Sequence, residues 1–447
     1  MKRLTMIVSI FSLLLICNMS LFSQQSEEQR RRDVLRFGLE GEVAELISQI
    51  KTESTSDYNQ EILDVFSRTR SSIIRESVID YCTDRSLPDL KQWSLEVLED
   101  PFDYKRSTVS AVFRYVEKLP LNEAAPLVRK LMSDEGSGYR ELAISTLGKI
   151  GGPEDAVFLA EYLDSEISGD EKQRLVIRQN VMTALGELKS EAVWEQLMEI
   201  ASDEDENTVI RATAAKALGS IGKIEAIDRL SVLYESNDPL LRAASVNALS
   251  NYTDERAQMV ITESFKDTHY KVRLEALEAA SKGKIAGIGP YILYRAKTDP
   301  VEAVKMRSFE ILSTVGGEEG ISWLTELMNE QKTPDKFRLK AITVLFSNHR
   351  DRVFNDVEKI ALETLKDDKK TWLRYECGKL FSKAEDSRLE SLSIAYIQHK
   401  DTVTKSLGME MYAKNRFSSV KDLVQTIADN DKMGGLQGRA KRILEAE

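Results

Sequence analysis

The chain is poor in the side chains that most often build metal sites and redox centres. Its 447 residues include only 3 histidines and 3 cysteines. His269, His349 and His399 lie far apart, and none has a second histidine or a carboxylate at metal-binding spacing. A zinc site needs three or four Cys, His or carboxylate ligands, and no cluster offers them. We therefore expect no metal, no cofactor and no catalytic centre of this kind.

Proline and glycine are also scarce, with 9 and 22 residues, which favours a mostly helical chain. The sequence has no Gly-x-Ser-x-Gly nucleophile elbow and no phosphate-binding glycine loop. Gly136-Ser137-Gly138 and Gly434-Gly435 are interpreted as turns between helices. These absences favour a protein that is not an enzyme.

Positive charge is in deficit, with 62 basic and 73 acidic residues and a net charge of −11. An acidic surface repels nucleic-acid phosphates and anionic membranes. We therefore expect no nucleic-acid partner.

The first residues form a separate segment. Met1-Lys2-Arg3 is basic, Leu4 to Phe22 is almost wholly apolar or small, and Ser23 offers a cleavage point. This pattern predicts an export signal over residues 1–23, to be excluded from the fold. The alternatives are a retained membrane anchor and a lipid attached at Cys17, although Ile16 is larger than the residue usual before a lipidated cysteine. Either way we expect an exported protein, in the periplasm or cell envelope of a bacterium.

A basic residue recurs along the rest of the chain at intervals of 31 to 38 residues. We call these twelve positions the rungs, the last of them degenerate: Arg75, Arg106, Arg140, Arg178, Arg211, Arg242, Arg273, Lys305, Arg338, Arg374, Lys405 and Gln437. Self-similarity at this period is typical of stacked supersecondary units and not of a closed globular domain.

Apolar or small residues recur at fixed offsets from each rung, at −1, +3, +4, +6 and +7. In one unit these are Ile210, Ala214, Ala215, Ala217 and Leu218. Such offsets make one stripe of a helix with 3.6 residues per turn. A shorter amphipathic segment precedes each rung helix, so each unit is predicted to be a pair of antiparallel helices. One pair cannot bury its own apolar face, so neighbouring pairs must stack.

An acid lies six residues before the rung in seven units, in the turn between the two helices: Asp100, Asp134, Asp205, Asp267, Asp299, Asp368 and Asp431. Stacking would line these acids and the rung bases into a ladder along the turns. We therefore favour structural pairing for Arg106, Arg140, Arg211, Arg273, Lys305 and Arg374, with value in fixing the orientation between units. The acid is missing at Lys172, Ser236, Lys332 and His399, where we expect the ladder to be broken.

The chain resembles the HEAT-repeat (armadillo-like) family. The resemblance is carried by the aspartate in the turn, the rung arginine and the Ala-x-x-Ala-Leu-Gly stretch that follows it, and the best copy is Val209 to Gly219. The resemblance covers about residues 58 to 447. It implies an all-α, right-handed α-solenoid of about twelve helix pairs, preceded by an N-terminal helical cap over residues 24–57. Some helical-repeat hydroxylases bind iron through His-Glu motifs, and this chain has no His-Glu dipeptide. A metal-dependent enzyme is therefore a distant alternative.

The resemblance also implies that second helices line the concave side, where positions +2 and +5 would point into a groove. These positions are mostly small or uncharged in the first half of the chain, as at Ser145, Asn180 and Thr183. In the second half they are long and charged, so we expect the polar, selective contacts there, at Glu275, Glu278, Arg307, Glu310, Lys340, Glu376 and Lys379.

Two units carry extra residues, around Asp164 to Gln173 within a repeat and around Ser347 to Phe354 between repeats. Longer loops on a rigid array are frequent contact points. Cys82 and Cys377 fall at core positions about nine repeats apart, so we expect two buried thiols and no disulfide between them.

We therefore predict a non-catalytic scaffold or adaptor of the cell envelope that holds one or more proteins along its groove. The alternative is a fixed structural component of a larger envelope assembly. The sequence leaves the partner and the oligomeric state open.

Overall fold

The computed structural model describes residues 27–53, 57–165, 167–282 and 285–446. The predicted export segment, including Cys17, lies outside the described residues. Within these ranges the secondary structure is helical and no strand is present, so the all-α prediction is confirmed. None of the described helices combines the length and the hydrophobicity that a bilayer span requires.

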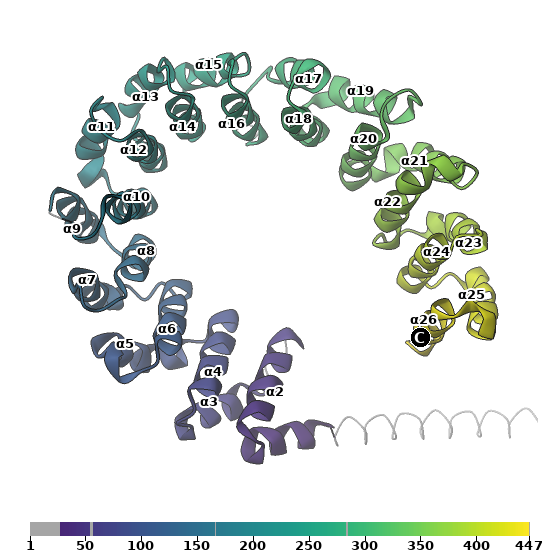
Figure 1. The fold of residues 1–447 in the computed structure, drawn as a ribbon, viewed down its shortest axis with the longest axis horizontal. Helices are drawn as coiled ribbons and strands as arrows, with labels where there is room; N and C mark the ends of the chain where they lie inside the picture. Colours follow the sequence, from purple (N-terminus) through teal and green to yellow (C-terminus); the bar gives the residue numbers. More distant parts are fainter. Residues whose placement is uncertain (1–26, 54–56, 166, 283–284, 447) are drawn as a thin grey trace, which may run out of the picture. The chain divides into compact units, whose positions relative to one another are not determined.

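The helices alternate between first helices and second helices, and the second helix is the longer of the two in every described pair except α21–α22 (Figure 1). The described residues form twelve such pairs, and each second helix contains one rung. The first helices are α3 (Asn59–Arg68), α5 (Lys91–Glu99), α7 (Ala125–Ser133), α9 (Pro153–Asp164), α11 (Trp194–Ser202), α13 (Ala226–Tyr234), α15 (Glu255–Ser264), α17 (Gly289–Thr298), α19 (Gly317–Asn329), α21 (Arg350–Thr364), α23 (Glu390–Gln398) and α25 (Lys421–Ala428).

The second helices are α4 (Ser72–Arg85), α6 (Arg106–Lys118), α8 (Arg140–Ile150), α10 (Glu171–Leu188), α12 (Thr208–Ile221), α14 (Pro239–Leu249), α16 (Tyr270–Ser281), α18 (Glu302–Val315), α20 (Asp335–Asn348), α22 (Thr371–Ser382), α24 (Thr402–Asn415) and α26 (Gly435–Glu445). A helix over residues 27–37 and α2 (Glu40–Glu53) precede the pairs, within the segment predicted as a cap. The α-solenoid prediction is thus confirmed.

Short 3₁₀ turns lead into several helices. Their bounds are η1 (Pro88–Leu90), η2 (Pro101–Asp103), η3 (Asn122–Ala124), η4 (Glu191–Val193), η5 (Asp368–Lys370), η6 (Ser387–Leu389), η7 (Ser418–Val420) and η8 (Asp431–Met433).

The chain divides into two compact units, Met1–Arg229 and Leu230–Glu447. Within each unit, second helices pack on the neighbouring second helices and first helices on the neighbouring first helices, which gives two layers. The contacts within the second-helix layer are the more extensive. The predicted apolar frame supplies the core between the layers: in α12, for example, Ile210, Ala214, Ala215 and Leu218 are all buried.

Glycines allow second helices to approach closely in unit 1. A Cβ atom on Gly148 of α8 would lie 2.8 Å from the Cα of Ala184 in α10, and one on Gly186 of α10 would lie 3.0 Å from the Cα of Ala217 in α12. Both glycines lie within their helices, so they are points of close packing and not helix ends.

The two stretches of extra residues have different structures. In the first, Ser165 and residues 167–170 lie outside helices, and Asp170 caps α10 by accepting a hydrogen bond of 2.8 Å from the N–H of Gln173. The second makes no loop, because α20 ends at Asn348 and α21 begins at Arg350. Its residues lengthen helices instead.

Candidate functional site

The rung arginines of α14 and α16 pair with aspartates of the following repeat. The Nε and Nη2 atoms of Arg273 donate to the two carboxylate oxygens of Asp299 at 2.7 and 2.8 Å. Arg242 holds Asp267 in the same way, at 2.7 and 2.9 Å. The remaining Nη1 of each arginine donates to carbonyl oxygens in the turn of its own repeat, including that of Asp267 for Arg273. Each arginine therefore joins two consecutive turns.

Burial makes the Arg273–Asp299 pair the tighter of the two, because these side chains are only 5% and 0% exposed. Burial alone would raise the pKa of Asp299, but hydrogen bonds from Arg273 and from the backbone N–H of Val301, with the charges of Arg273 and Arg295, lower that pKa below its ordinary value of 3.8. The carboxylate is thus held ionised.

At most other joints the rung base finds a different acceptor in place of the predicted aspartate. Arg106 donates to the carbonyl oxygen of Gly138, Arg211 to that of Ala201, Arg338 to that of Met328, Lys405 to that of Ile397, and Arg374 to the hydroxyl of Thr404 and the carbonyl oxygen of Thr364. Arg178 binds Glu206, the residue after Asp205, and Lys305 lies 6.0 Å from the ring centroid of Phe337. Asp100, Asp134, Asp205 and Asp368 are exposed, and Asp368 pairs with Lys400 at 2.6 Å.

The predicted groove charges of unit 2 contact one another. Glu278 of α16 binds Arg307 of α18 at 2.6 Å, Arg307 also binds Glu310, and Glu310 binds Lys340 of α20. This chain of opposite charges crosses three neighbouring second helices. Glu275 accepts a hydrogen bond of 3.2 Å from Asn247 of α14, and Glu376 pairs with Lys379 inside α22 at 2.7 Å. The charges therefore largely neutralise one another on the face of these helices.

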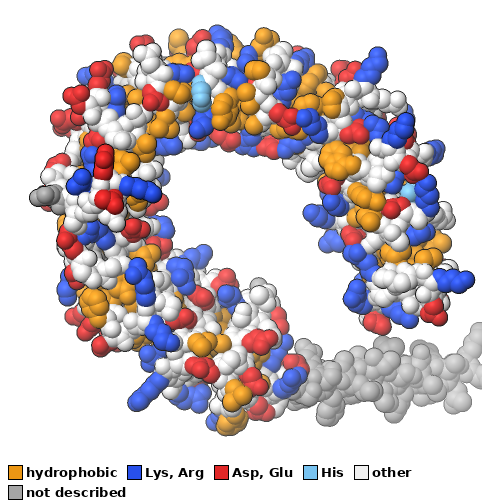
Figure 2. Space-filling view, in the orientation of Figure 1, with side chains coloured by type: hydrophobic (Ala, Val, Ile, Leu, Met, Phe, Trp, Pro, Cys, Tyr) orange, Lys and Arg blue, Asp and Glu red, His pale blue; other side chains and the backbone are white. Residues whose placement is uncertain are grey.

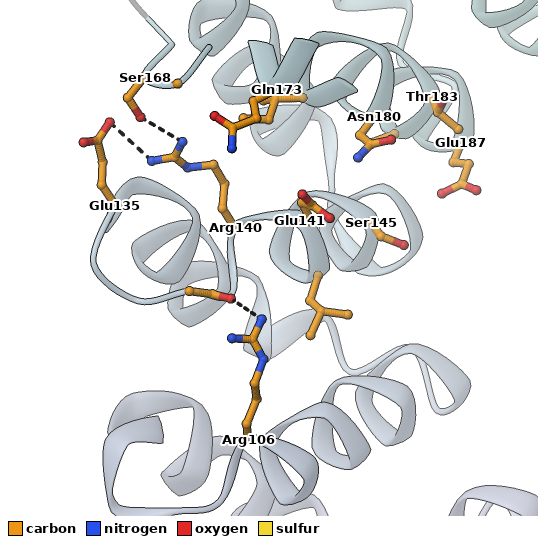
Figure 3. Close-up of a pocket in the computed structure, with 15 residues that line it drawn as sticks. Arg106, Glu135, Arg140, Glu141, Ser145, Ser168, Gln173, Asn180, Thr183 and Glu187 are labelled. Atoms are coloured by element: carbon orange, nitrogen blue, oxygen red, sulfur yellow. Dashed lines mark hydrogen bonds and ion pairs between the residues drawn. The ribbon is translucent and has the colours of Figure 1, made fainter. Parts of the chain in front are cut away.

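A large hollow lies in unit 1, on the second-helix face between α8 and α10. We call it the α8–α10 pocket. It has a volume of about 840 Å³, and the side chains in Figure 3 line it. Ser145 of α8 and Asn180 and Thr183 of α10 contribute, and all three occupy positions +2 or +5 of the repeat frame. The repeat frame predicts that these positions face a groove, but the charge pattern places the selective contacts in the second half of the chain, and nothing in the sequence predicts a pocket here.

The inserted loop forms one end of the α8–α10 pocket. Arg140 donates to the Ser168 hydroxyl of this loop at 3.1 Å and pairs with Glu135 at 3.3 Å (Figure 3). The Nε atom of Arg140 is buried and has no hydrogen-bond partner in the part of the chain that the structure describes. The two ends of the pocket therefore differ, since Arg106 and Arg140 lie at the turns while Glu187 lies farther along α10.

The lining offers hydrogen-bond donors and acceptors. Ser145, Gln173, Asn180 and Thr183 each donate and accept, and Glu141 adds an acceptor. Within the described ranges, no group of three or more His, Cys, Asp or Glu side chains is placed to hold a metal.

Sequence reasoning missed Glu135, Ser168, Gln173 and Glu187, which also line the α8–α10 pocket. The extra residues of the 38-residue interval were the available signal for Ser168 and Gln173. Glu135 and Glu187 had none, because both lie off the repeat frame.

The fold and the repeat frame define an α-solenoid protein of the HEAT type, a class typical of protein-interaction scaffolds. The sequence model of the family described as Spirochaete HEAT repeat protein matches residues 35–443. The chain belongs to this family, which confirms the resemblance stated above.

Among solved structures, the chain is similar to the karyopherin Kap121p, with 13% identity and a TM-score of 0.40 over 90% of this chain and 49% of that one. Kap121p bound to Pho4p matches with 12% identity and a TM-score of 0.41, over 92% of this chain and 52% of that one. The chain thus spans about half the length of these proteins. Comparison with curated proteins finds no match.

Proposed function

We propose that the protein is a non-catalytic scaffold that holds a partner protein against its second-helix face, with the α8–α10 pocket as an anchoring point. The observation that carries this proposal is the pocket itself, about 840 Å³ of space over the +2 and +5 positions of two successive repeats. The repeat frame leaves these positions free of core packing, so they are available to a partner.

The chemistry of the lining favours a peptide segment over a small molecule. Small-molecule sites are mostly apolar, with a few placed polar groups. The α8–α10 pocket is more polar than such a site, since Glu141, Gln173, Thr183 and Glu187 are exposed polar side chains beside Leu142 and Ile177. An extended segment carries a donor and an acceptor at almost every residue, which matches side chains that both donate and accept.

Unit 2 offers a second contact surface in the row from Glu278 to Lys340. Surface pairs of this kind are worth about 0–1 kcal/mol each. A partner with alternating charges would exchange pairs there at small net cost and would be selected by its charge order. We propose that the predicted groove residues select a partner by its charge order. They are Glu275, Glu278, Arg307, Glu310, Lys340, Glu376 and Lys379.

We further propose that the protein acts after export, in the periplasm or cell envelope of a bacterium. The support is the basic start followed by the apolar stretch from Leu4 to Phe22, with a lipid at Cys17 as the alternative form of attachment. The rival function is a fixed component of a larger envelope assembly, which would purify with partners in constant ratio.

The test is photocrosslinking in living cells. A photoreactive residue at Thr183, which is exposed in the α8–α10 pocket, is compared with one at Glu161, which is exposed on α9 in the other layer. After cell fractionation, mass spectrometry identifies what is attached. We expect a reproducible envelope protein from Thr183 and not from Glu161.

Equal crosslinking from both positions would contradict a site on the second-helix face. Recovery of an uncleaved chain from the cytoplasm would contradict the location. If the protein purifies with envelope partners in a constant ratio although Thr183 gives no crosslink, the fixed structural component is favoured.

A further inference from the structure

The joint between α22 and α24 carries a histidine where other repeats carry the aspartate of the turn. His399 stands six residues before the rung of α24, the place that Asp299 takes before the rung of α18. Asp299 binds Arg273, the rung arginine of the preceding repeat, through both carboxylate oxygens. At the α22–α24 joint the corresponding arginine is Arg374, which is only 2% exposed. A half-buried imidazole therefore replaces the carboxylate at this joint.

A chain of hydrogen bonds joins His399 to Arg374. The Nδ1 atom of His399 accepts a hydrogen bond of 3.1 Å from the backbone N–H of Asp401. The Asp401 carboxylate caps α24 by accepting hydrogen bonds from the N–H and the hydroxyl of Thr404, at 2.8 and 2.7 Å. The Thr404 hydroxyl in turn accepts a hydrogen bond of 3.0 Å from the Nε atom of Arg374. The imidazole thus orients the residue that caps α24 and, through it, the acceptor of a buried guanidinium.

This arrangement requires a neutral imidazole. Nδ1 can accept the N–H of Asp401 only while it carries no proton, so protonation would turn two donors toward each other. Burial and the charge of Arg374 lower the pKa of His399 below its ordinary value of 6.5. The charge of Asp401 and a hydrogen bond with the backbone of Leu365 act in the opposite direction, and burial and Arg374 outweigh them.

The other charged groups at the α22–α24 joint are already engaged. Lys400, the next residue, adds a positive charge that also disfavours a proton on His399. Lys400 pairs with Asp368 of η5 at 2.6 Å. The Asp401 carboxylate accepts the hydrogen bonds that cap α24 and a further one from the side chain of Tyr375 in α22. These contacts leave the joint with no free carboxylate among the groups that act on the imidazole.

Histidine protonation is also the main change of charge that this chain undergoes in mild acid. Ordinary carboxylates stay ionised down to about pH 5, whereas an ordinary histidine gains its proton between about pH 8 and 5. The chain has only 3 histidines, and Figure 2 shows few histidine side chains among many acidic and basic ones. Mild acid therefore acts at a few places in the array, and the α22–α24 joint is one of them.

We propose that His399 makes the α22–α24 joint a pH-sensitive point of unit 2, which opens more often in mild acid. Because the folded state disfavours the proton, the stability that depends on neutral His399 is present above the ordinary pKa of 6.5 and is lost as the pH falls below that value. Contacts between neighbouring repeats hold the array together, so the loss is expected at this joint and not throughout the chain.

The test is thiol labelling of the full chain with dithiodipyridine, an aromatic disulfide that also reacts with thiols in mild acid. Cys377 is buried in α22, one helical turn after Arg374, and buried Cys82 of unit 1 is the internal reference. Peptide mass spectrometry gives the labelling rate of each thiol. We expect the ratio of the Cys377 rate to the Cys82 rate to rise at least about threefold from about pH 7.5 to about pH 5.

Two substitutions of His399 separate its charge from its hydrogen bond. His399→Asn is expected to abolish the rise, because an amide oxygen also accepts the N–H of Asp401 and does not titrate. His399→Asp is expected to slow the labelling of Cys377 at both pH values, because a carboxylate at this place can bind Arg374. Circular dichroism at neutral pH verifies that the variants fold.

The matched control is His269→Asn. The Nδ1 atom of His269 also accepts a backbone N–H two residues further on, that of Lys271 at 3.4 Å. A proton on His269 is favoured by the charge of Asp267, whose pKa it helps to lower. We therefore expect His269→Asn to keep the full rise in the labelling ratio.

A ratio that stays constant with pH in the unaltered chain, the same rise in His399→Asn, or loss of the rise in His269→Asn would each overturn the proposal. NMR of the untagged, histidine-labelled chain adds a direct check, because the His399 signal, identified by its absence from His399→Asn, is expected to titrate below pH 6.5. A midpoint at or above that value would also overturn the proposal. None of these results bears on the α8–α10 pocket, whose test is the crosslinking at Thr183.

Discussion

At the scale of single residues, the main finding is that a base binds an acid of the next repeat. Arg273 and Asp299 are 26 positions apart, and their side chains are almost completely buried. A buried ion pair is costly to break, because the remaining charge stays in a low-dielectric site. These two side chains therefore hold consecutive repeats of unit 2 in one orientation.

Replacement of Asp299 by asparagine tests this role. We expect Asp299→Asn to lower the free energy of unfolding by about 3–5 kcal/mol, because Arg273 would keep its charge without a counterion. Urea titration followed by circular dichroism measures the change. The matched control is Asp368→Asn, whose solvent-exposed pair with Lys400 predicts little or no change in stability. Similar effects of the two substitutions would contradict a special role for the buried pair.

The same pairs predict an acid limit to stability. Opposing the effect of burial, hydrogen bonds from the arginines lower the pKa of Asp267 and Asp299 below 3.8 in the folded state. A depressed folded pKa contributes stability that is present above the unfolded pKa and is lost as pH falls through the folded pKa. We expect the urea midpoint to fall steeply below about pH 4, and less steeply in Asp299→Asn. Parallel curves for the two proteins would contradict this origin.

The sequence predicted these residues but not their partners. The offset of six along the chain marks both the acid and the base of one repeat, whereas the contact crosses to the next repeat. Consistent with that geometry, Arg211 uses a carbonyl oxygen, and the following repeat has Ser236 where the acid would be. Arg106 does not bind Asp134, which stays exposed, because the turn places the carbonyl oxygen of Gly138 within reach of the guanidinium instead. The repeat frame gives residue types and offsets, so it does not predict this backbone acceptor.

At the scale of elements, glycines set the separation of second helices. Gly148 of α8 faces Ala184 of α10, and a methyl group there would lie 2.8 Å from the Ala184 Cα atom, closer than Cβ atoms approach backbone. The side chain of Glu187, which lines the α8–α10 pocket, lies over the same glycine. The packing of these two helices and the shape of the pocket are thus coupled.

We expect Gly148→Ala to destabilise the protein by about 1–3 kcal/mol, because overpacking outweighs the gain in helix propensity. Gly438 provides the matched control, because it lies inside α26 and a methyl group there meets nothing within 4 Å. Gly438→Ala is expected to be neutral or to stabilise by up to about 1 kcal/mol. Thermal unfolding of the two variants decides between these signs. Stabilisation by Gly148→Ala would show that α8 and α10 separate without cost.

The element scale was also the most predictable from sequence. The helical period indicated each helix pair, because burial on one face is a local property of the chain. The extra residues were less informative. Of the two long intervals, one places residues outside helices before α10 and the other gives longer helices around His349, because the number of extra residues does not specify the backbone path.

At the scale of the whole molecule, each compact unit has one buried cysteine among the residues that the structure describes. Cys82 lies in α4 and Cys377 in α22, and burial raises the pKa of each thiol to about 12. Only the thiolate reacts rapidly with alkylating agents, so both side chains should be inert in the folded protein. They are natural reporters of the two units.

We expect iodoacetamide at pH 8 to leave Cys82 and Cys377 unlabelled, and added urea to expose them at different concentrations. The reason is that a repeat array is stabilised by contacts between neighbours and unfolds in parts. Peptide mass spectrometry after brief labelling follows each thiol. Coincident transitions would show that the two units unfold as one.

The directional ion pair has a consequence for how such a chain lengthens. The segment from Thr268 to Asp299 contains one rung, Arg273, and ends with the acid that Arg273 itself binds. A tandem duplication of this segment would supply both copies of this rung arginine with a carboxylate. The segment that contains Lys305 has no such acid, because Lys332 occupies its place. We therefore expect a duplication of the segment around α16 to be better tolerated than one of the segment that contains Lys305.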